Sequence, residues 1–346
     1  MAHRRRDRRQ STGKPVELTW DDINHILLPI ARYQILDTET LIAVNVQHKH
    51  LSESWIRRRL KEFYHEENTS HGGPYLDRTR LLPKNTLDIS KLIREIGHSP
   101  DLHFLTEHAH AALDTWVPKR RPSIIQFGHR TSHHLRHKVY DACGHASLLD
   151  LGVLTTDIAP VFWYHIQESN HFPKKTKALA DPFSIPLPMS RSRNGKKPAH
   201  YEPDDLLGFE YPSVHHRIPY RFCPIEIDGG TEPNDSKTPR NSSLGNKFDD
   251  ILALLDTGGF REHLGLPNKS IYPLFLFESQ RRMENNIELL RRKHKERNRP
   301  GADRFGFKCL QFKRPSSLVP MPDPDLFLKP WRTIHDELDL TQSPTI

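Results

Sequence analysis

Long hydrophobic runs and cysteines are scarce in this sequence. No stretch of about 18 apolar residues occurs, which argues against a membrane-spanning helix. The opening residues MAHRRRDRRQ lack the apolar core of a signal peptide, so we expect a cytoplasmic protein without membrane association. The three cysteines, Cys143, Cys223 and Cys309, are far apart, which argues against a disulfide framework and a paired-cysteine zinc site.

The chain is basic and long enough for about two domains. Its 346 residues include 51 lysines and arginines against 43 acidic residues, which leaves a formal charge of +8. Hydrophobic residues make up 35% and charged residues 27%, a balance that favours a folded middle with solvated ends. Residues 1–17 are rich in arginine and almost free of apolar side chains, so we expect a disordered basic arm there.

Three helices are expected between residue 18 and about residue 65. Thr19 and Asp22 resemble a capping box at the start of the first, and Pro29 should kink or shorten that helix. A second helix fits after Asp37, and a third begins after Ser52 as its N-cap. The third helix has one apolar stripe at helical spacing, formed by Ile56, Leu60, Phe63 and Tyr64.

The opposite face of this third helix is basic. It carries Arg57, Arg58 and Lys61, and a glycine turn then leads into a charged segment that contains Arg78. This order suits a winged helix-turn-helix, in which the third helix enters the major groove of double-stranded DNA while the wing and the arm meet phosphates. The alternative is a three-helix packing unit with a solvated arginine face.

Histidines recur every four residues at His129, His133 and His137, on one face of an expected helix. This spacing could supply two or three imidazoles to a metal ion. Because no paired carboxylate or cysteine accompanies them in the sequence, we favour a helix face near DNA or a polar interface.

Acidic residues gather in two expected strands, HYEPDDLLGFEY and YRFCPIEIDGG. In the second strand, period two places Glu226 and Asp228 on one face. If the strands pair, Asp204 or Asp205 joins them, and three hard oxygen ligands suit Mg²⁺ or Mn²⁺. Such an ion could activate water and neutralise a phosphodiester as it is attacked. The alternative is that these acids form a turn and end a strand, with Lys247 an ordinary solvated residue.

The order of these motifs resembles the replication-relaxation protein family of bacterial plasmids and mobile elements. The resemblance covers most of residues 18–296, and its most specific piece is EIDGGTEP, followed by a helix bearing Lys247, the strand IYPLFLFES and QRRMENNIELL. It implies a role in replication or mobilisation of an extrachromosomal element, with a relaxase or a replication initiator as a partner.

The acidic strands also resemble the PD-(D/E)XK nuclease fold, a mixed sheet flanked by helices that cuts DNA with a divalent ion. This resemblance matches Asp204 to the aspartate of the motif and Glu226 to its second acid, and it implies Mg²⁺, with Mn²⁺ as a substitute. The sequence departs from the pattern at Asp228, which stands where the lysine should be. Lys247, on the next helix, is the candidate to replace that lysine.

A last basic cluster lies at the end of the helix after residue 280, where six cations fall within nine residues from Arg291 and Arg292 onward. Cations at a helix C-terminus are partly a dipole effect. This number exceeds that need, so we expect phosphate contacts there.

The sequence therefore predicts an α+β or α/β protein, with a winged helix-turn-helix before a nuclease-like mixed sheet. The expected segments are a basic arm at 1–17, a winged-helix DNA-binding domain with a helical extension at 18–118, the α/β domain at 119–312 and a proline-rich tail at 313–346. Three functions stay open: a Mg²⁺-dependent DNA endonuclease, a non-catalytic DNA-binding accessory protein with a degenerate nuclease fold, and a transcriptional repressor acting as a homodimer.

Overall fold

The chain forms two compact units in a computed structural model. The first unit comprises residues 1–146 and 311–322, and the second comprises residues 147–310 and 323–346. Across the two units, the structure describes residues 16–45, 51–65, 73–80, 101–117, 135–188, 199–212, 219–229, 233–234, 243–297, 301–313 and 319–344. Most of the expected basic arm lies outside the described residues.

The first unit combines short helices with a small antiparallel sheet. Its strands β1 (Leu36–Asp37), β2 (Leu76–Arg80) and β3 (Asp101–Leu105) are arranged in the order β1-β3-β2. Its helical segments are, in chain order, α1 (Trp20–Asp22), η2 (Ile23–Leu27), α2 (Leu28–Tyr33), α3 (Thr38–Asn45), α4 (Glu53–His65), α6 (Glu107–Trp116) and most of α7 (Leu135–Leu148).

Local signals in the sequence explain how these helices begin. Thr19 and Asp22 form the expected capping box, with the Asp22 amide donating to the Thr19 hydroxyl at 3.2 Å. The Trp55 amide donates to the Ser52 hydroxyl, so Ser52 caps α4 as expected. The expected disturbance at Pro29 takes the form of a π-helical turn, η2, directly before α2. A proline ring crowds the carbonyl four residues earlier, and a wider turn relieves that contact.

The apolar stripe of α4 lies in the core of the first unit. All four of its members are buried, as the helical period predicted, namely Ile56, Leu60, Phe63 and Tyr64. The ring of Phe63 also packs edge-to-face against Tyr75, directly before β2. This packing leaves the basic side of α4 exposed.

The second unit is built on a seven-stranded mixed sheet of order β12-β11-β10-β9-β8-β7-β4. Strand β8 is parallel to β9, and β9 is parallel to β10, while the other neighbours are antiparallel. The strands are β4 (Ala159–Val161), β7 (Asp205–Glu210), β8 (Tyr220–Asp228), β9 (Leu274–Phe277), β10 (Gly306–Cys309), β11 (Trp331–Arg332) and β12 (Glu337–Leu338). Together with its helices, this sheet confirms the expected α+β class.

The remaining elements of the second unit surround this sheet. A separate two-stranded sheet consists of β5 (Ile185–Pro186) and β6 (His200–Tyr201). The helical segments are η4 (Val153–Thr155), α8 (Trp163–Glu168), α9 (Lys174–Lys177), α10 (Leu244–Thr257), α11 (Gly259–Leu264), η6 (Asn268–Ser270), α12 (Gln280–Arg297), η7 (Ala302–Arg304) and α13 (Asp325–Leu328).

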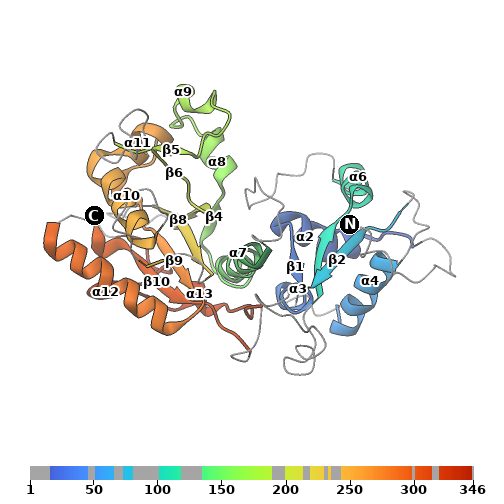
Figure 1. Ribbon diagram of the computed structural model, residues 1–346. Coiled ribbons are helices and arrows are strands. Elements are labelled where there is room, and N and C mark those ends of the chain that lie inside the picture. The colour runs from blue at the N-terminus through green and yellow to red at the C-terminus, as the bar shows by residue number, and fades with distance from the viewer. Residues whose placement is uncertain are drawn as a thin grey trace. The chain divides into compact units, whose positions relative to one another are not determined.

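Helices α10 and α12 cover one face of the sheet, with an aromatic core between the layers (Figure 1). Phe248 of α10 packs edge-to-face on Phe275 of β9, with ring centroids 4.9 Å apart. Phe222 of β8 belongs to the same core, and period two therefore places Glu226 and Asp228 on this face as well. The acidic residues of β8 thus lie beneath two helices.

The C-terminal segment is part of the second unit. We expected a proline-rich tail from residue 313, yet β11 and β12 extend the large sheet, and Trp331 is fully buried. The Trp331 indole donates a hydrogen bond to the Leu326 carbonyl oxygen at 2.7 Å. The segment folds because its few large apolar side chains, such as Trp331, are buried where β11 and β12 extend the edge of the sheet.

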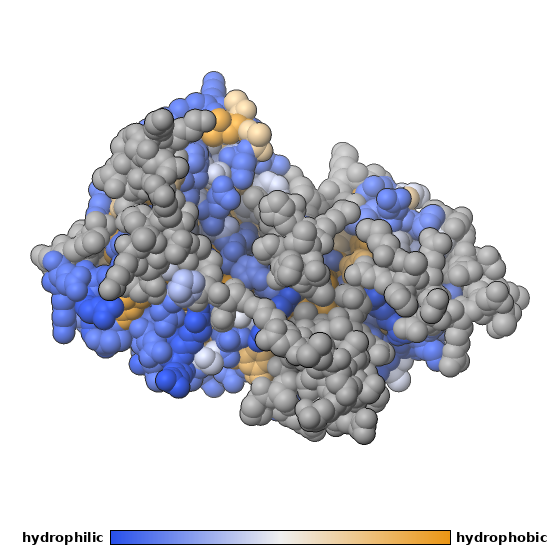
Figure 2. Space-filling model, in the orientation of Figure 1, coloured by the Kyte–Doolittle hydropathy of each residue, from blue (hydrophilic) through white to orange (hydrophobic). Residues whose placement is uncertain are grey.

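The described surface is mostly hydrophilic on the face in view, with only small hydrophobic patches (Figure 2). The exposed large hydrophobic residues are scattered along the chain, as is normal for a globular protein, and are Trp20, Leu154, Leu179, Tyr220, Met321 and Leu328. Within the described part of the chain, no helix is both long and apolar enough to cross a membrane.

Candidate acidic site on the seven-stranded sheet

Strands β7 and β8 bring Asp204 and Glu226 together. The strands pair antiparallel with Asp205 opposite Ile225, which places Asp204 opposite Glu226 one step further along. One carboxylate oxygen of Asp204 accepts a hydrogen bond from the Ile227 amide at 2.8 Å. The pairing that the sequence left conditional is therefore present, and of the two candidate aspartates Asp204 is the one beside Glu226.

Lys247 reaches the same place from helix α10. Its Nζ atom lies 2.6 Å from Oε2 of Glu226, whose side chain is 1% exposed. Helix α10 begins after Ser243, which caps it by accepting a hydrogen bond from the Asn246 amide. Lys247 thus lies in the first turn of α10, which packs over β8. It contacts Glu226, which is 21 positions earlier in the chain.

The surroundings of Glu226 hold its carboxyl group near the point of ionisation. Burial raises the pKa of Glu226 from its ordinary 4.5 to about 7, even though Lys247 lowers it. The nearby Asp204 raises this pKa further, and the nearby Tyr201 hydroxyl lowers it. A second positive charge at this place would therefore strongly favour the ionised form of Glu226.

The residues present fit a divalent cation. Among the described residues, Oε1 of Glu226 has no partner that meets hydrogen-bond geometry, although it is buried. A buried polar atom without a partner is costly and calls for an ion or a water molecule. The donors at hand are carboxylate oxygens of Asp204 and Glu226, the hard ligands that Mg²⁺ and Mn²⁺ prefer.

Asp228 is engaged elsewhere. Both of its carboxylate oxygens accept hydrogen bonds from Arg282 of α12, one of them at 2.9 Å from Nη2. The Asp228 side chain is 2% exposed and that of Arg282 is 18% exposed. Of the three predicted metal ligands, Asp228 is therefore the one whose two carboxylate oxygens both accept from a single arginine.

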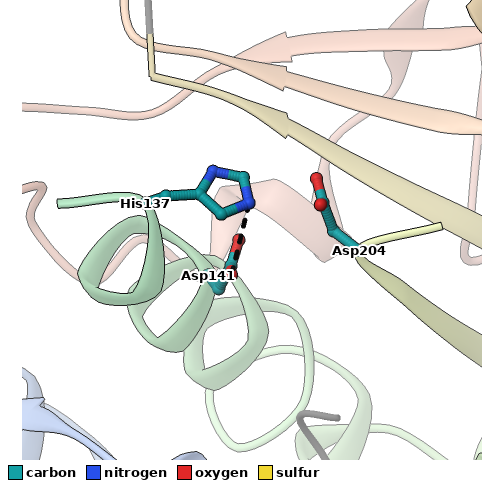
Figure 3. A group of neighbouring side chains, drawn as sticks. All are labelled: His137, Asp141 and Asp204. Carbon is teal, nitrogen blue, oxygen red and sulfur yellow. Dashed lines mark ion pairs between the residues drawn. The ribbon is translucent and has the colours of Figure 1, made fainter. Parts of the chain in front are cut away.

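The histidine series is only partly described. His129 and His133 lie outside the described residues. His137 is on α7, where its Nε2 atom lies 3.6 Å from a carboxylate oxygen of Asp141, one turn further on (Figure 3). Figure 3 also shows Asp204, which directly precedes β7. Asp141 was not among the predicted site residues, although its spacing of four residues from His137 places both side chains on one helix face.

The basic residues of α4 are mostly paired with acids. Arg57 contacts Glu39 at 2.6 Å and Glu53 at 2.8 Å, and these hydrogen bonds raise the pKa of Arg57. Arg58 lies 3.7 Å from Glu62 and is 64% exposed. Lys61 is also exposed. All three are on the face that the sequence predicted, but Arg57 must exchange its acidic partners before it can bind a phosphate.

The other predicted DNA contacts have structural partners as well. Arg78 lies 4.0 Å above the ring of Tyr64 and 3.3 Å from Asp101. On α12, Arg291 donates to Glu288 and to the carbonyl oxygen of Ile334. Arg292 is exposed on the same helix.

No family model, curated protein or solved structure matches the chain. The arrangement of Asp204, Glu226 and Lys247 is therefore the main indication of function. Sequence reasoning found these three residues but missed Tyr201 and Arg282, whose partners come from other elements of the fold.

Proposed function

We propose that the second unit cleaves DNA phosphodiester bonds with Mg²⁺, for which Mn²⁺ can substitute, and that the first unit binds double-stranded DNA. The observation that carries this proposal is the contact between Lys247 and the buried Glu226, beside Asp204. Two acids and a lysine converge there, from the residue before β7, from β8 and from α10.

Each residue of this group has a distinct role in the proposed reaction. Asp204 and Glu226 would hold the cation through carboxylate oxygens. A bound Mg²⁺ supplies an activated water molecule and offsets negative charge on the phosphodiester. Lys247 would place its ammonium group next to the phosphate oxygens, where negative charge increases in the transition state. Burial of Glu226 keeps bulk water from screening these charges.

The nuclease resemblance supports these assignments with one change. In the PD-(D/E)XK pattern the lysine follows the second acid on the same strand, and Asp228 occupies that position here. Lys247 supplies the ammonium group from α10 instead, and its 2.6 Å contact with Glu226 is what such a relocated lysine requires. The mixed sheet with helices on its face is also what this resemblance implies.

The first unit is proposed to be a winged helix-turn-helix. Its support is a small antiparallel sheet next to α3 and α4, with the basic side of α4 exposed. In this proposal α4 enters the major groove, where Arg58 and Lys61 meet phosphates. The biological role that the replication-relaxation resemblance implies is replication or mobilisation of a plasmid or mobile element, with a relaxase or replication initiator as partner.

A cleavage assay tests the catalytic proposal. Supercoiled plasmid is incubated with the full chain and Mg²⁺ or Mn²⁺, and nicked and linear products are measured. We expect cation-dependent cleavage that Glu226→Gln abolishes. Glu210→Gln is the matched control, because Glu210 is an exposed acid of β7 that accepts from Tyr220 and should leave cleavage unchanged. Intact plasmid with both cations would refute the catalytic proposal.

The second candidate function is a non-catalytic DNA-binding accessory protein or regulator. It is favoured by the Asp228–Arg282 ion pair, which fills the position of the nuclease lysine with a structural contact. In that case the full chain binds duplex DNA and Glu226→Gln leaves its biological activity intact. Complementation by Glu226→Gln of a plasmid that depends on this protein separates the two functions.

A further inference from the structure

Tyr201 lies within the acidic site, although neither motif includes it. It is the last residue of β6 and pairs with Ile185 of β5. Its ring packs edge-to-face against Phe260 of α11, with centroids 6.4 Å apart. These contacts bury the side chain, which is 3% exposed, and they place its hydroxyl group among acids.

The hydroxyl group of Tyr201 interacts with the carboxyl group of Glu226. Burial raises the pKa of Tyr201 well above 10, and the charges of Glu226, Asp204 and Asp250 raise it further. A tyrosine hydroxyl group ordinarily carries its proton at neutral pH and can act as a donor. It interacts with Glu226, yet among the described residues neither this hydroxyl nor Oε1 of Glu226 has a partner at good hydrogen-bond geometry.

We propose that Tyr201 is a positioning residue, whose hydroxyl group orients Glu226 so that its carboxylate and that of Asp204 bind one divalent cation. This inference rests on the cation site of the proposed function. Lys247 already holds Oε2 of Glu226, which leaves Oε1 as the oxygen that the Tyr201 hydroxyl would orient. Partners that orient a metal ligand typically contribute about 10-fold to 100-fold in metal affinity.

Titration of the full-length protein with Mn²⁺ tests this inference. The loss of the free Mn²⁺ signal in electron paramagnetic resonance reports binding directly, without DNA or turnover. We expect Tyr201→Phe to weaken Mn²⁺ binding by about 10-fold to 100-fold. Tyr211→Phe is the matched control, because Tyr211 is also buried and donates to the Leu340 carbonyl oxygen at 2.7 Å, apart from the acids. It should bind Mn²⁺ as the wild type does.

The outcomes separate this inference from the proposed function. Equal Mn²⁺ affinity in Tyr201→Phe and wild type overturns the inference, and plasmid cleavage can still establish the nuclease. Weaker binding in Tyr201→Phe with no cleavage by the wild type supports the inference and refutes the nuclease. A wild type that binds no Mn²⁺ overturns both.

Circular dichroism melting accompanies the titration. Phenylalanine keeps the ring that packs on Phe260, so we expect the folded signal to be retained. A Tyr201→Phe protein that fails to fold would overturn the inference, because the hydroxyl group would then be required by the fold itself.

Discussion

The ammonium group of Lys247 lies 2.6 Å from a carboxylate oxygen of Glu226, which is almost completely buried. Lys247 belongs to the first turn of α10, and Glu226 belongs to the centre of the sheet. A lysine of the helix layer and an acid of the sheet are thus joined, and Asp204, directly before the neighbouring strand β7, adds a second acid. The proposed chemistry and most of its tests follow from this contact.

Replacing Lys247 should lower the rate of plasmid cleavage to a similar extent with Mg²⁺ and with Mn²⁺. We expect Lys247→Gln to lower the plasmid cleavage rate by about 100-fold to 1,000-fold, the usual effect of losing one group that stabilises transition-state charge. Lys293→Gln is the matched control, because Lys293 contacts Asp249 of the same helix α10 at 3.0 Å with a similarly small exposure. Equal rate losses in both variants would mean that Lys247 acts only through stability.

The stability of the cation-free protein should depend on pH through Glu226. Its pKa is about 7 in the folded chain against an ordinary 4.5, so between these values the folded state keeps a proton that the unfolded chain has lost. This contribution is fully present below about pH 4.5 and is lost as the pH rises through about 7. Relative to Glu226→Gln, the wild type should lose roughly 3 kcal/mol between about pH 4 and about pH 8.

Urea unfolding at a series of pH values measures this difference. The control is Glu210→Gln, whose curve should run parallel to that of the wild type because Glu210 is exposed. Parallel curves for wild type and Glu226→Gln would show that the Glu226 carboxyl group has an ordinary pKa and contradict its burial as described.

The Asp228–Arg282 ion pair should be important for folding. Arg282→Leu leaves the carboxylate of Asp228 without its partner at 2% exposure, which should lower the free energy of unfolding by about 3–5 kcal/mol. The double variant Asp228→Asn with Arg282→Leu should recover most of that loss. Arg332→Leu is the control, because Arg332 and Glu284 form an exposed pair worth about 1 kcal/mol at most. A small effect of Arg282→Leu would return Asp228 to the list of cation ligands.

Removing the acid beside Arg57 should strengthen DNA binding by α4. Glu39→Gln frees Arg57 from one of its two acidic partners and removes a negative charge near the DNA, so we expect duplex affinity to rise about 2-fold to 5-fold. Fluorescence anisotropy with a labelled duplex measures this change. Glu107→Gln, at an exposed position of α6, should not alter affinity. Weaker DNA binding by Glu39→Gln would contradict the proposal that DNA contacts this face of α4.

The exposed cations of α4 should contribute to the salt dependence of binding. In the double variant Arg58→Ala with Lys61→Ala, two phosphate contacts are lost. The negative slope of log affinity against log salt should therefore become shallower by about 2. Lys177→Ala, an exposed position on α9, is the control for a general loss of charge. An unchanged slope in the double variant would exclude α4 from the DNA contact.

Local periodicity predicted the elements that carry the site. The four-residue spacing from Ile56 to Leu60 gave the buried stripe of α4, and alternation in β8 placed Glu226 and Asp228 on one face. The sequence left the pairing of β7 with β8 conditional, and the structure shows that the two strands pair. These features depend on neighbours in sequence, which is why a single sequence shows them.

Contacts between distant elements could not be predicted in the same way. Arg282 meets Asp228 because α12 packs on the sheet at one particular rotation, and the two residues are 54 positions apart. Arg59 lies next to the basic face of α4, yet it turns inward to Asp22 at 2.6 Å. Proline content suggested a tail after residue 313, and only the sheet edge shows why Trp331 is buried.

A crystal structure of the protein soaked with Mn²⁺ tests the central claim most directly, because the anomalous signal of manganese locates the ion without any assumption about activity. Our account predicts one strong anomalous peak bound by carboxylate oxygens of Asp204 and Glu226. A peak on other residues, or none at this position at high Mn²⁺ concentration, would contradict it.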